Sequence, residues 1–338
     1  MAYRAHLVNA PDLFALPVPE EDLARLEARL RSVVTRGDPF LDEISTHLIE
    51  AGGKRVRPAL TLAAASLAGI DASEDTLLGG VSVELVHLAS LYHDDVMDEA
   101  TRRRNVPSVN ARWGNLLAIV AGDFLLARSA EIAASLGTEI AGLLAATLAR
   151  LCQGQIAEVR SAYRLDRSEE DYLVAIADKT AALMSTACRI GGITAGLERP
   201  QIEALTRFGE CLGIVFQIRD DVLDVVAGEQ ELGKPPGQDL AEGIYTLPVQ
   251  RALLDRQIGP KLRSLLGRPL GREEVEVARE LVAASPGITA SAHTARRYAN
   301  EATDTALSLG DGIVPKALSE LGMSLLDDLE RSTRALAS

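Results

Sequence analysis

Two short acidic motifs carry the clearest chemical signal in this sequence. Residues 93–98 read His-Asp-Asp-Val-Met-Asp, and residues 219–224 read Arg-Asp-Asp-Val-Leu-Asp, each in an otherwise apolar segment. On a helix, Asp94 and Asp98 would lie one turn apart on one face, with Asp95 about 100° round the axis. The second motif repeats this spacing with three further carboxylates: Asp220, Asp221 and Asp224.

Carboxylates at this spacing need a counterion. Like charges one turn apart destabilise a helix, and burying them among apolar neighbours costs more unless they are neutralised. Because no His or Cys pair accompanies them, their oxygen atoms favour a hard cation, and Mg²⁺ completes its shell with water and phosphate oxygens. One motif alone could be a solvated helix face. Two copies on separate apolar segments predict that the motifs bind Mg²⁺.

Basic residues near the first motif indicate a polyanionic ligand. Residues 52–58, GGKRVRP, stand where one predicted helix ends and the next begins, beside the free N–H groups of a helix start. Three consecutive arginines, residues 102–104, follow the first motif. Arg can hold a phosphate with two hydrogen bonds, whereas Lys acts as a point charge. Taken alone, Arg55 and Arg102 are read as surface charges. Four residues are interpreted as anion-binding: Lys54, Arg57, Arg103 and Arg104.

Several polar side chains on apolar segments could complete this site. His87 lies seven residues before Asp94, two turns along the same face. A lone His is more often a core residue, but this alignment favours a site. Gln217 lies one turn before the second motif, and Lys179 and Thr180 stand in an Ala-rich segment where a charge needs a partner. Lys234 lies in a long loop and could close over a ligand.

Helices must position nearly all of these residues. Apolar residues recur at three- and four-residue spacings almost everywhere from residue 20 onward, and strand-type alternation is missing. The exception is the Gly- and Pro-rich loop 228–243, which should not be helical and whose length suggests function. We therefore predict an all-α fold in a single domain over residues 1–338, with residues 1–19 as an N-terminal extension. The helices are expected at 20–34, up to 50, 58–70, 76–98, 108–136, 139–163, 169–195, 201–227, 246–256, 272–283, 289–308 and 315–336.

Composition indicates which partners and which cellular compartment the protein has. The net charge of −13 argues against a nucleic-acid partner, although local basic clusters could still bind an anion. The three scattered cysteines (Cys152, Cys188 and Cys211) indicate reduced thiols in the core of a cytoplasmic protein, not a disulfide framework or zinc site. The N-terminus lacks a signal pattern, and no transmembrane segment is expected because no 18-residue apolar stretch is free of polar groups.

These motifs, in this order, make the sequence resemble the trans-polyprenyl diphosphate synthase family. The likeness is strongest over residues 40–250. It implies the isoprenoid synthase fold, a helical bundle around a central elongated cavity, usually in a homodimer. It also implies Mg²⁺-dependent addition of isopentenyl diphosphate to an allylic diphosphate. The segments that carry the resemblance are GGKRVRP (52–58), ELVHLASLYHDDVMDEATRRR (84–104), NARWGNLLAIVAGDFLLA (110–127), FQIRDDVLD (216–224) and GKPPGQDLAEG (233–243).

The resemblance also implies roles for individual residues. Asp94 and Asp98 would bind two Mg²⁺ ions and Asp220 a third. Asp95, Asp221 and Asp224 would add secondary contacts, with Asp224 also expected at the metal. The diphosphate of isopentenyl diphosphate would be held by Lys54, Arg57, His87 and Arg104. The allylic substrate would be held by Arg103, Lys179, Thr180, Gln217 and Lys234. One departure is Ile244, which stands where the family often has Lys and removes one diphosphate contact.

The helix before Asp94 is expected to set the product length. Ala89 and Ser90 lie five and four residues upstream of this carboxylate, and Val86 lies one turn deeper. None is bulky, whereas an aromatic residue here blocks the tunnel in short-chain members of the family. We therefore expect a product longer than four isoprene units, with a geranylgeranyl diphosphate synthase as the alternative.

Three other functions compete with this interpretation. A class I terpene cyclase usually replaces the second acidic motif with an Asn/Ser/Glu motif and lines its pocket with aromatic residues, which make up only 4% of this chain. A non-catalytic subunit of a heteromeric synthase generally loses an acidic motif or the basic set, and both are present here. A helical protein that stores divalent ions would leave the basic residues unexplained.

Overall fold

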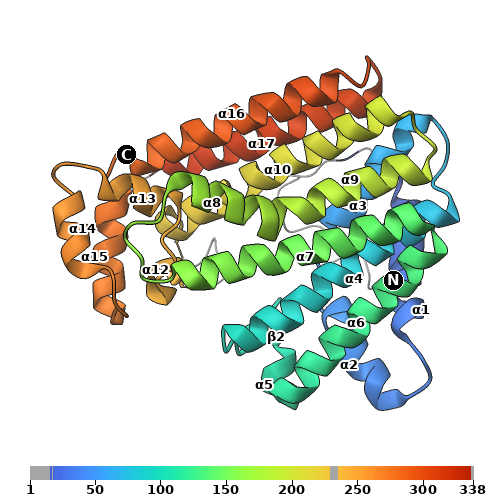
Figure 1. The fold of residues 1–338 in the computed structure, drawn as a ribbon, viewed down its shortest axis with the longest axis horizontal. Coiled ribbons are helices and arrows are strands. Elements are labelled where there is room, and N and C mark those ends of the chain that lie inside the picture. The colour runs from blue at the N-terminus through green and yellow to red at the C-terminus, as the bar shows by residue number, and fades with distance from the viewer. Residues whose placement is uncertain (1–15, 17, 229–234, 336–338) are drawn as a thin grey trace. The chain divides into compact units, whose positions relative to one another are not determined.

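The computed structural model describes residue 16, residues 18–228 and residues 235–335. Helices joined by short loops make up most of this part of the chain, and its strands form one sheet of two two-residue strands, β1 (Arg102–Arg103) and β2 (Val106–Pro107) (Figure 1). The prediction of an all-α fold is therefore confirmed. The two strands are not predicted, because two residues are too few to show the side-chain alternation of a strand.

The residues group into two compact units. Of the described residues, the first unit comprises those up to 148 together with 183–206 and 312–317, and the second comprises 149–182, those between 207 and 311, and those from 318 onward. The division falls inside the helices α7 (Thr138–Ser161), α10 (Arg199–Val226) and α17 (Ile313–Ala335), and near the start of α9 (Ala182–Thr194). The single domain and its central cavity stay predictions, and each unit is described by itself below.

The first unit is built around α4 (Glu74–Met97), which packs against several other helices and most extensively against α6 (Figure 1). Its residues are buried on every side over much of its length, and a helix that is apolar all round belongs in the interior. Ser73 caps its start by accepting a hydrogen bond from the N–H of Thr76 at 3.1 Å. The surrounding elements are α1 (Glu20–Val34), α2 (Pro39–Glu50), α3 (Val56–Ala65), η2 (Ser66–Ala68), α5 (Val109–Trp113) and α6 (Asn115–Ser135).

The second unit gathers shorter helices around α13 (Leu247–Leu253), which contacts four of its neighbours. The other elements are α8 (Glu169–Ile176), the π-helical turn η3 (Ala177–Ala181), α12 (Gln238–Glu242), α14 (Gly259–Leu265), α15 (Arg272–Ala283) and α16 (Gly287–Leu307). A capping box of Ser168 and Asp171 starts α8. A π turn inside a helix is rare and is frequent at functional sites.

The structure adds one helix that was not predicted, α14, and corrects two of the predicted segments. The expected helix 108–136 is broken at Gly114, whose φ of 88° ends α5 and starts α6. The expected loop 228–243 contains α12, because the carbonyl and carboxylate of Asp224 accept the N–H groups of Gly237 and Asp239 at 2.8 and 3.1 Å and anchor this turn. Residues 229–234 of that loop lie outside the described residues.

Two predictions about composition can be compared with the structure. All three cysteines are free thiols. Cys188 and Cys211 are buried as predicted for core thiols, whereas Cys152 is exposed, so the prediction is wrong for this residue. By length and apolar composition α7 could cross a membrane, and 22% of its most apolar window is buried. This is weak support for a membrane span, because core helices meet the same test. The predicted absence of a transmembrane segment stays a prediction.

Candidate active site

The first acidic motif lies at the C-terminal end of α4. The backbone N–H of Asp98 donates to the carbonyl of Asp94 at 2.8 Å, so the two residues stand one helical turn apart as predicted. Asp94 is half-buried and Asp98 is exposed, whereas Asp95 is fully buried. The helix thus presents two of its three carboxylates at its end and turns the third inward.

Asp95 is paired with Arg103. Nε and Nη2 of Arg103 lie 2.8 and 2.6 Å from Oδ1 of Asp95. The other carboxylate oxygen of Asp95, Oδ2, is buried without a hydrogen-bond partner in the described part of the chain. Burial raises the pKa of Asp95, and Arg103 opposes that rise. The structure therefore connects these two predicted site residues directly to each other.

A tight hairpin delivers Arg103 and Arg104. Arg102 pairs with Pro107, and Arg103 with Val106, across the two strands. The two central residues, Arg104 and Asn105, have φ of 50° and 63°, as a type I′ turn requires. The strands and this turn fix the directions in which Arg103 and Arg104 point. These directions were not predicted from the sequence.

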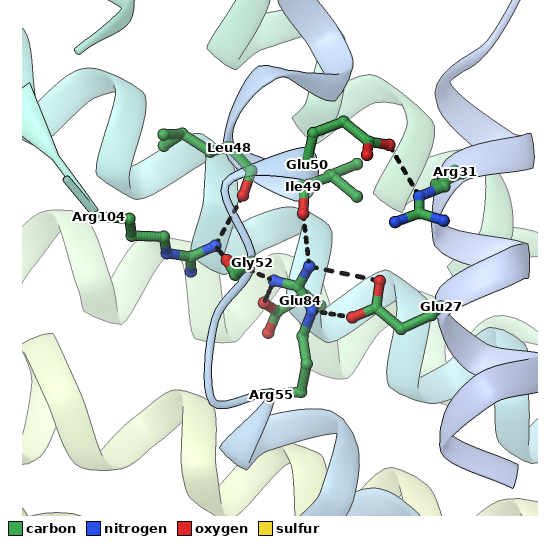
Figure 2. Close-up of polar contacts among 9 residues, drawn as sticks. All are labelled: Glu27, Arg31, Leu48, Ile49, Glu50, Gly52, Arg55, Glu84 and Arg104. Carbon is green, nitrogen blue, oxygen red and sulfur yellow. Dashed lines mark hydrogen bonds and ion pairs between the residues drawn. The ribbon is translucent and has the colours of Figure 1, made fainter. Parts of the chain in front are cut away.

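Arg104 reaches the loop between α2 and α3. Its Nη1 donates to the carbonyl of Leu48 at 2.8 Å and also to that of Gly52 (Figure 2). A Cβ added to Gly53, whose φ is 155°, would lie 2.8 Å from Cζ of Arg104. Only glycine fits there, so the Gly-Gly of the GGKRVRP segment allows the guanidinium to dock on the loop.

His87, Arg57 and Arg104 form a cluster of basic side chains in the first unit. Burial, and then the positive charges of Arg57, Arg104, Arg55 and Arg103, hold the pKa of His87 well below its usual value. Nε of Arg57 is buried and has no hydrogen-bond partner among the described residues. Lys54 is exposed in the adjoining loop. A buried cationic nitrogen without a partner, beside other cations, is suited to an anion.

The predicted role of Arg55 as a surface charge is wrong. Its side chain is buried and is paired with the carboxylates of Glu27 and Glu84. These partners lie 28 and 29 residues away in sequence, so no local pattern pointed to them.

The second acidic motif belongs to the part of α10 in the second unit. Asp220 is half-buried and forms an ion pair with Arg219 at 2.9 Å. Asp221 and Asp224 are buried, and Asp224 anchors the start of α12 as described above. Burial raises the pKa of Asp221 to about 7, and hydrogen bonds from Tyr172 and Gln217 oppose that rise.

A chain of hydrogen bonds links four side chains of the second unit. Thr180 donates to Gln217 at 2.6 Å, Gln217 donates to Asp221 at 2.7 Å, and Tyr172 donates to Asp221 at 2.5 Å. Thr180 stands on the π turn η3. The structure thus brings together three predicted residues. Sequence reasoning missed Tyr172, whose only signal was a hydroxyl on an apolar helix face that needs a partner.

Lys179, also on the π turn, pairs with Glu158 of α7. Lys234 lies outside the described residues. Ile244 is half-buried, and its backbone N–H donates to the carbonyl of Asp239 at 2.8 Å. Among the residues expected to set product length, Ala89 and Val86 are buried, and Ser90 is half-buried with its hydroxyl donating to the carbonyl of His87.

The donor chemistry of the acidic motifs fits a hard divalent cation, because every side chain offered is a carboxylate. Within the described residues, no three His, Cys, Asp or Glu side chains already form a metal-binding group. That is expected for an ion whose shell is completed by water and phosphate oxygens. The metal roles of Asp94, Asp98, Asp220 and Asp224 stay predictions.

Comparison with known proteins places this chain in a family. A family model described as Polyprenyl synthetase matches residues 38–284. The nonaprenyl diphosphate synthase of Mycobacterium tuberculosis is 40% identical over 303 residues, which cover 88% of this chain and 90% of that protein. The heptaprenyl diphosphate synthase component 2 of Geobacillus stearothermophilus is 39% identical over 296 residues, which cover 87% and 90%.

A solved structure supports the same assignment. The crystal structure of polyprenyl synthase from Caulobacter crescentus, complexed with calcium and isoprenyl diphosphate, matches with a TM-score of 0.85 at 32% identity. The match covers 91% of this chain and 94% of that one. The predicted resemblance is thus confirmed: the chain belongs to the polyprenyl synthetase family, prenyltransferases with an all-α isoprenoid synthase fold.

Proposed function

We propose that this protein catalyses the Mg²⁺-dependent head-to-tail condensation of isopentenyl diphosphate with an allylic diphosphate. The product is an all-trans polyprenyl diphosphate longer than C20. The observation that carries the proposal is the basic cluster of His87, Arg57 and Arg104, which stands on and beside the helix that ends in the first acidic motif. The cluster holds more positive charge than the carboxylate of Glu84 can neutralise, and a diphosphate would supply the remaining negative charge.

One set of side chains binds the diphosphate of isopentenyl diphosphate, and another set binds the diphosphate of the allylic substrate. Lys54, Arg57 and Arg104 bind the diphosphate of isopentenyl diphosphate, and His87 binds as a neutral imidazole because its pKa is lowered. Asp94, Asp98, Asp220 and Asp224 hold about three Mg²⁺ ions, which when bound would neutralise the charge of the departing allylic diphosphate. Thr180 and Gln217 hold Asp221 in place, and with Lys179 they surround the allylic substrate.

Small residues before the first motif support a long product. Ala89, Ser90 and Val86 all lack an aromatic ring, and the relatives named above make heptaprenyl and nonaprenyl products according to their names. A geranylgeranyl product is the alternative. The sizes of the products formed decide between the two.

The test is incubation of the purified chain with Mg²⁺, radiolabelled isopentenyl diphosphate and allylic starters of several lengths, followed by product sizing. We expect labelled diphosphates longer than C20, and no product after EDTA treatment or in the variants Asp94→Ala and Asp220→Ala. Release of a cyclic hydrocarbon would support a terpene cyclase instead. Activity only after addition of a second protein would support a partner subunit, as the name "component 2" of one relative suggests.

We further propose a homodimer in the cytoplasm. On α6, the apolar side chains of Leu116, Ile119 and Val120 are exposed by 76%, 42% and 55%, and this spacing places them on one side of the helix. An exposed apolar stripe of this kind marks a site of protein association. Sedimentation of the purified chain should give twice the monomer mass, and Ile119→Lys should shift it toward the monomer. A wild-type chain that sediments as a monomer would contradict the dimer.

A further inference from the structure

Arg55 occupies an unusual position for a charged residue. It is the residue before α3, with φ of 47° and ψ of 37°, in the left-handed region that non-glycine residues rarely adopt. Its side chain is nevertheless only 6% exposed. Both the backbone conformation and the burial of a guanidinium are costly, so the surrounding contacts must hold it there.

Three helices of the first unit supply those contacts, as Figure 2 shows. Nη1 of Arg55 lies 3.0 Å from Oε1 of Glu84 on α4, and Nη2 donates to the carbonyl of Ile49 on α2 at 3.1 Å. Nε and Nη2 reach the two oxygens of Glu27 on α1. Burial alone would lower the pKa of Arg55, but the two carboxylates outweigh it and raise the pKa.

This clamp fixes the loop that carries two proposed substrate ligands. Lys54 precedes Arg55 directly, and Arg57 follows it by two residues in the first turn of α3. Arg55 and Arg104 also cap the C-terminal end of α2. Arg55 donates to the carbonyl of Ile49, and Arg104 donates to the carbonyls of Leu48 and Gly52. The loop is therefore tied to the rest of the first unit on both sides.

The clamp also decides which cation Glu84 neutralises. Glu84 is 2% exposed and is held by Nη1 of Arg55 at 3.0 Å. Burial lowers the pKa values of Arg57 and Arg104, and the nearby charge of Glu84 opposes that lowering in both. The carboxylate of Glu84 forms its ion pair with Arg55. Without Arg55, the buried carboxylate of Glu84 would need another cation, and Arg57, with its unpartnered Nε, is the candidate.

We propose that Arg55 is a positioning residue for the isopentenyl diphosphate site. Gripped by Glu84 and Glu27, it holds Lys54 and Arg57 in place and keeps Glu84 from pairing with Arg57. This inference rests on the proposed function, since it assigns a role in binding that reaction's substrate.

The test compares Arg55→Met with the double variant Arg55→Met/Glu84→Gln. Met imposes the same backbone strain as Arg, so the comparison isolates the charge. With the allylic substrate and Mg²⁺ saturating, Arg55→Met should raise the KM for isopentenyl diphosphate by about 10- to 100-fold, while kcat changes by less than about threefold. Removing the Glu84 charge in the double variant should recover about tenfold of that loss, because Arg57 is then released.

The control is Arg29→Met, which removes an exposed arginine of α1 that pairs with Glu74. It should leave both constants unchanged. An unchanged KM in a folded Arg55→Met variant would overturn the proposal, and so would a double variant no better than the single one. A merely structural role predicts a lower kcat through loss of folded enzyme, with an unchanged KM for isopentenyl diphosphate in both variants.

A binding measurement tests this proposal independently of the proposed function. It includes a second variant, so the test remains decisive if Arg55→Met folds poorly. Inorganic pyrophosphate is titrated calorimetrically in EDTA into the wild type, Arg55→Met and Glu27→Gln; the last loosens the clamp and keeps the guanidinium. Both variants should bind at least about tenfold more weakly than the wild type. Equal binding by the wild type and Glu27→Gln would contradict the clamp. Failure of the wild type to elongate any starter would contradict only the proposed function.

Discussion

The hydroxyl of Tyr172 donates a 2.5 Å hydrogen bond to Oδ2 of Asp221, and both side chains are buried. Gln217 donates to the other carboxylate oxygen at 2.7 Å. Two neutral donors from α8 and α10 therefore satisfy a buried carboxylate within the second acidic motif. The contact joins residues that are 49 positions apart in the sequence.

Tyr172→Phe should destabilise the protein by about 1–3 kcal/mol, because it leaves Oδ2 of Asp221 buried without its donor. Urea denaturation measures the change in the free energy of unfolding. Tyr298→Phe is the control, since no hydrogen bond of that hydroxyl is seen within the described residues, and it should cost less than about 0.5 kcal/mol. Equal effects of the two variants would show that the hydrogen bond contributes nothing.

Gly154→Ala should disturb the π turn that carries Lys179 and Thr180. A Cβ at Gly154 of α7 would lie 2.5 Å from the backbone nitrogen of Lys179 and 2.9 Å from the carbonyl oxygen of Ala175. Since backbone atoms cannot step aside cheaply, we expect a loss of about 1–3 kcal/mol in stability. We also expect a raised KM for the allylic substrate.

Gly142 on the same helix supplies a matched control for this substitution. No heavy atom of the described residues lies within 4 Å of a Cβ built there. Gly142→Ala should therefore stabilise the protein by about 0.4–1 kcal/mol through the unfolded chain. Thermal denaturation of both variants checks the pair, and a harmless Gly154→Ala would refute the close approach.

Local patterns predicted most of the helices. Leu26 and Leu30 recur at helical spacing and are buried in α1, whose bounds match the predicted segment 20–34. The helical spacing of Asp94 and Asp98 was likewise predictable, because it depends only on residues of one helix. Such features are encoded within a few neighbouring residues.

Contacts between distant segments were not predictable from the sequence. Whether Arg55 is exposed depends on Glu27 and Glu84, which local spacing cannot bring into view. The π turn at residues 177–181 is another example, because its sequence continues an ordinary helical pattern on both sides. The same holds for the orientation of Arg103 toward Asp95, which depends on a hairpin of two-residue strands.

Ser90→Phe should shorten the product. The side chain is half-buried one turn before the first acidic motif, so an aromatic ring there would occupy the proposed path of the growing chain. Ala89 is less suitable for this test, because it is fully buried in the core of the first unit and a larger side chain there would overpack it. Sizing of dephosphorylated products measures the effect.

Ser90→Ala is the control for that experiment and should keep the wild-type product length. Both variants should unfold within a few degrees of the wild type, which excludes damage to the fold. A fully active Ser90→Phe enzyme that makes the wild-type product would rule out this face of α4 as the determinant of length.

His87 should make the stability of the protein depend on pH near neutrality. Burial and four neighbouring arginines hold its pKa in the folded state well below the ordinary value of about 6.5. When the pH falls below about 6.5, the unfolded chain binds a proton at His87 that the folded chain does not. The free energy of unfolding should therefore decrease on acidification, by up to about 1.4 kcal/mol per pH unit from this group.

His87→Gln removes this contribution and should flatten the dependence between pH 7.5 and 5.5. Asp221, whose pKa is raised to about 7, titrates in the same window in both proteins, so the difference between their slopes reports on His87. Urea denaturation across that range measures the slope for the wild type and the variant. His293→Gln, at an exposed position of α16, should keep the wild-type slope. If His87→Gln keeps it too, the imidazole takes up its proton as readily in the folded state as in the unfolded chain. The basic cluster would then not surround His87 as the structure places it.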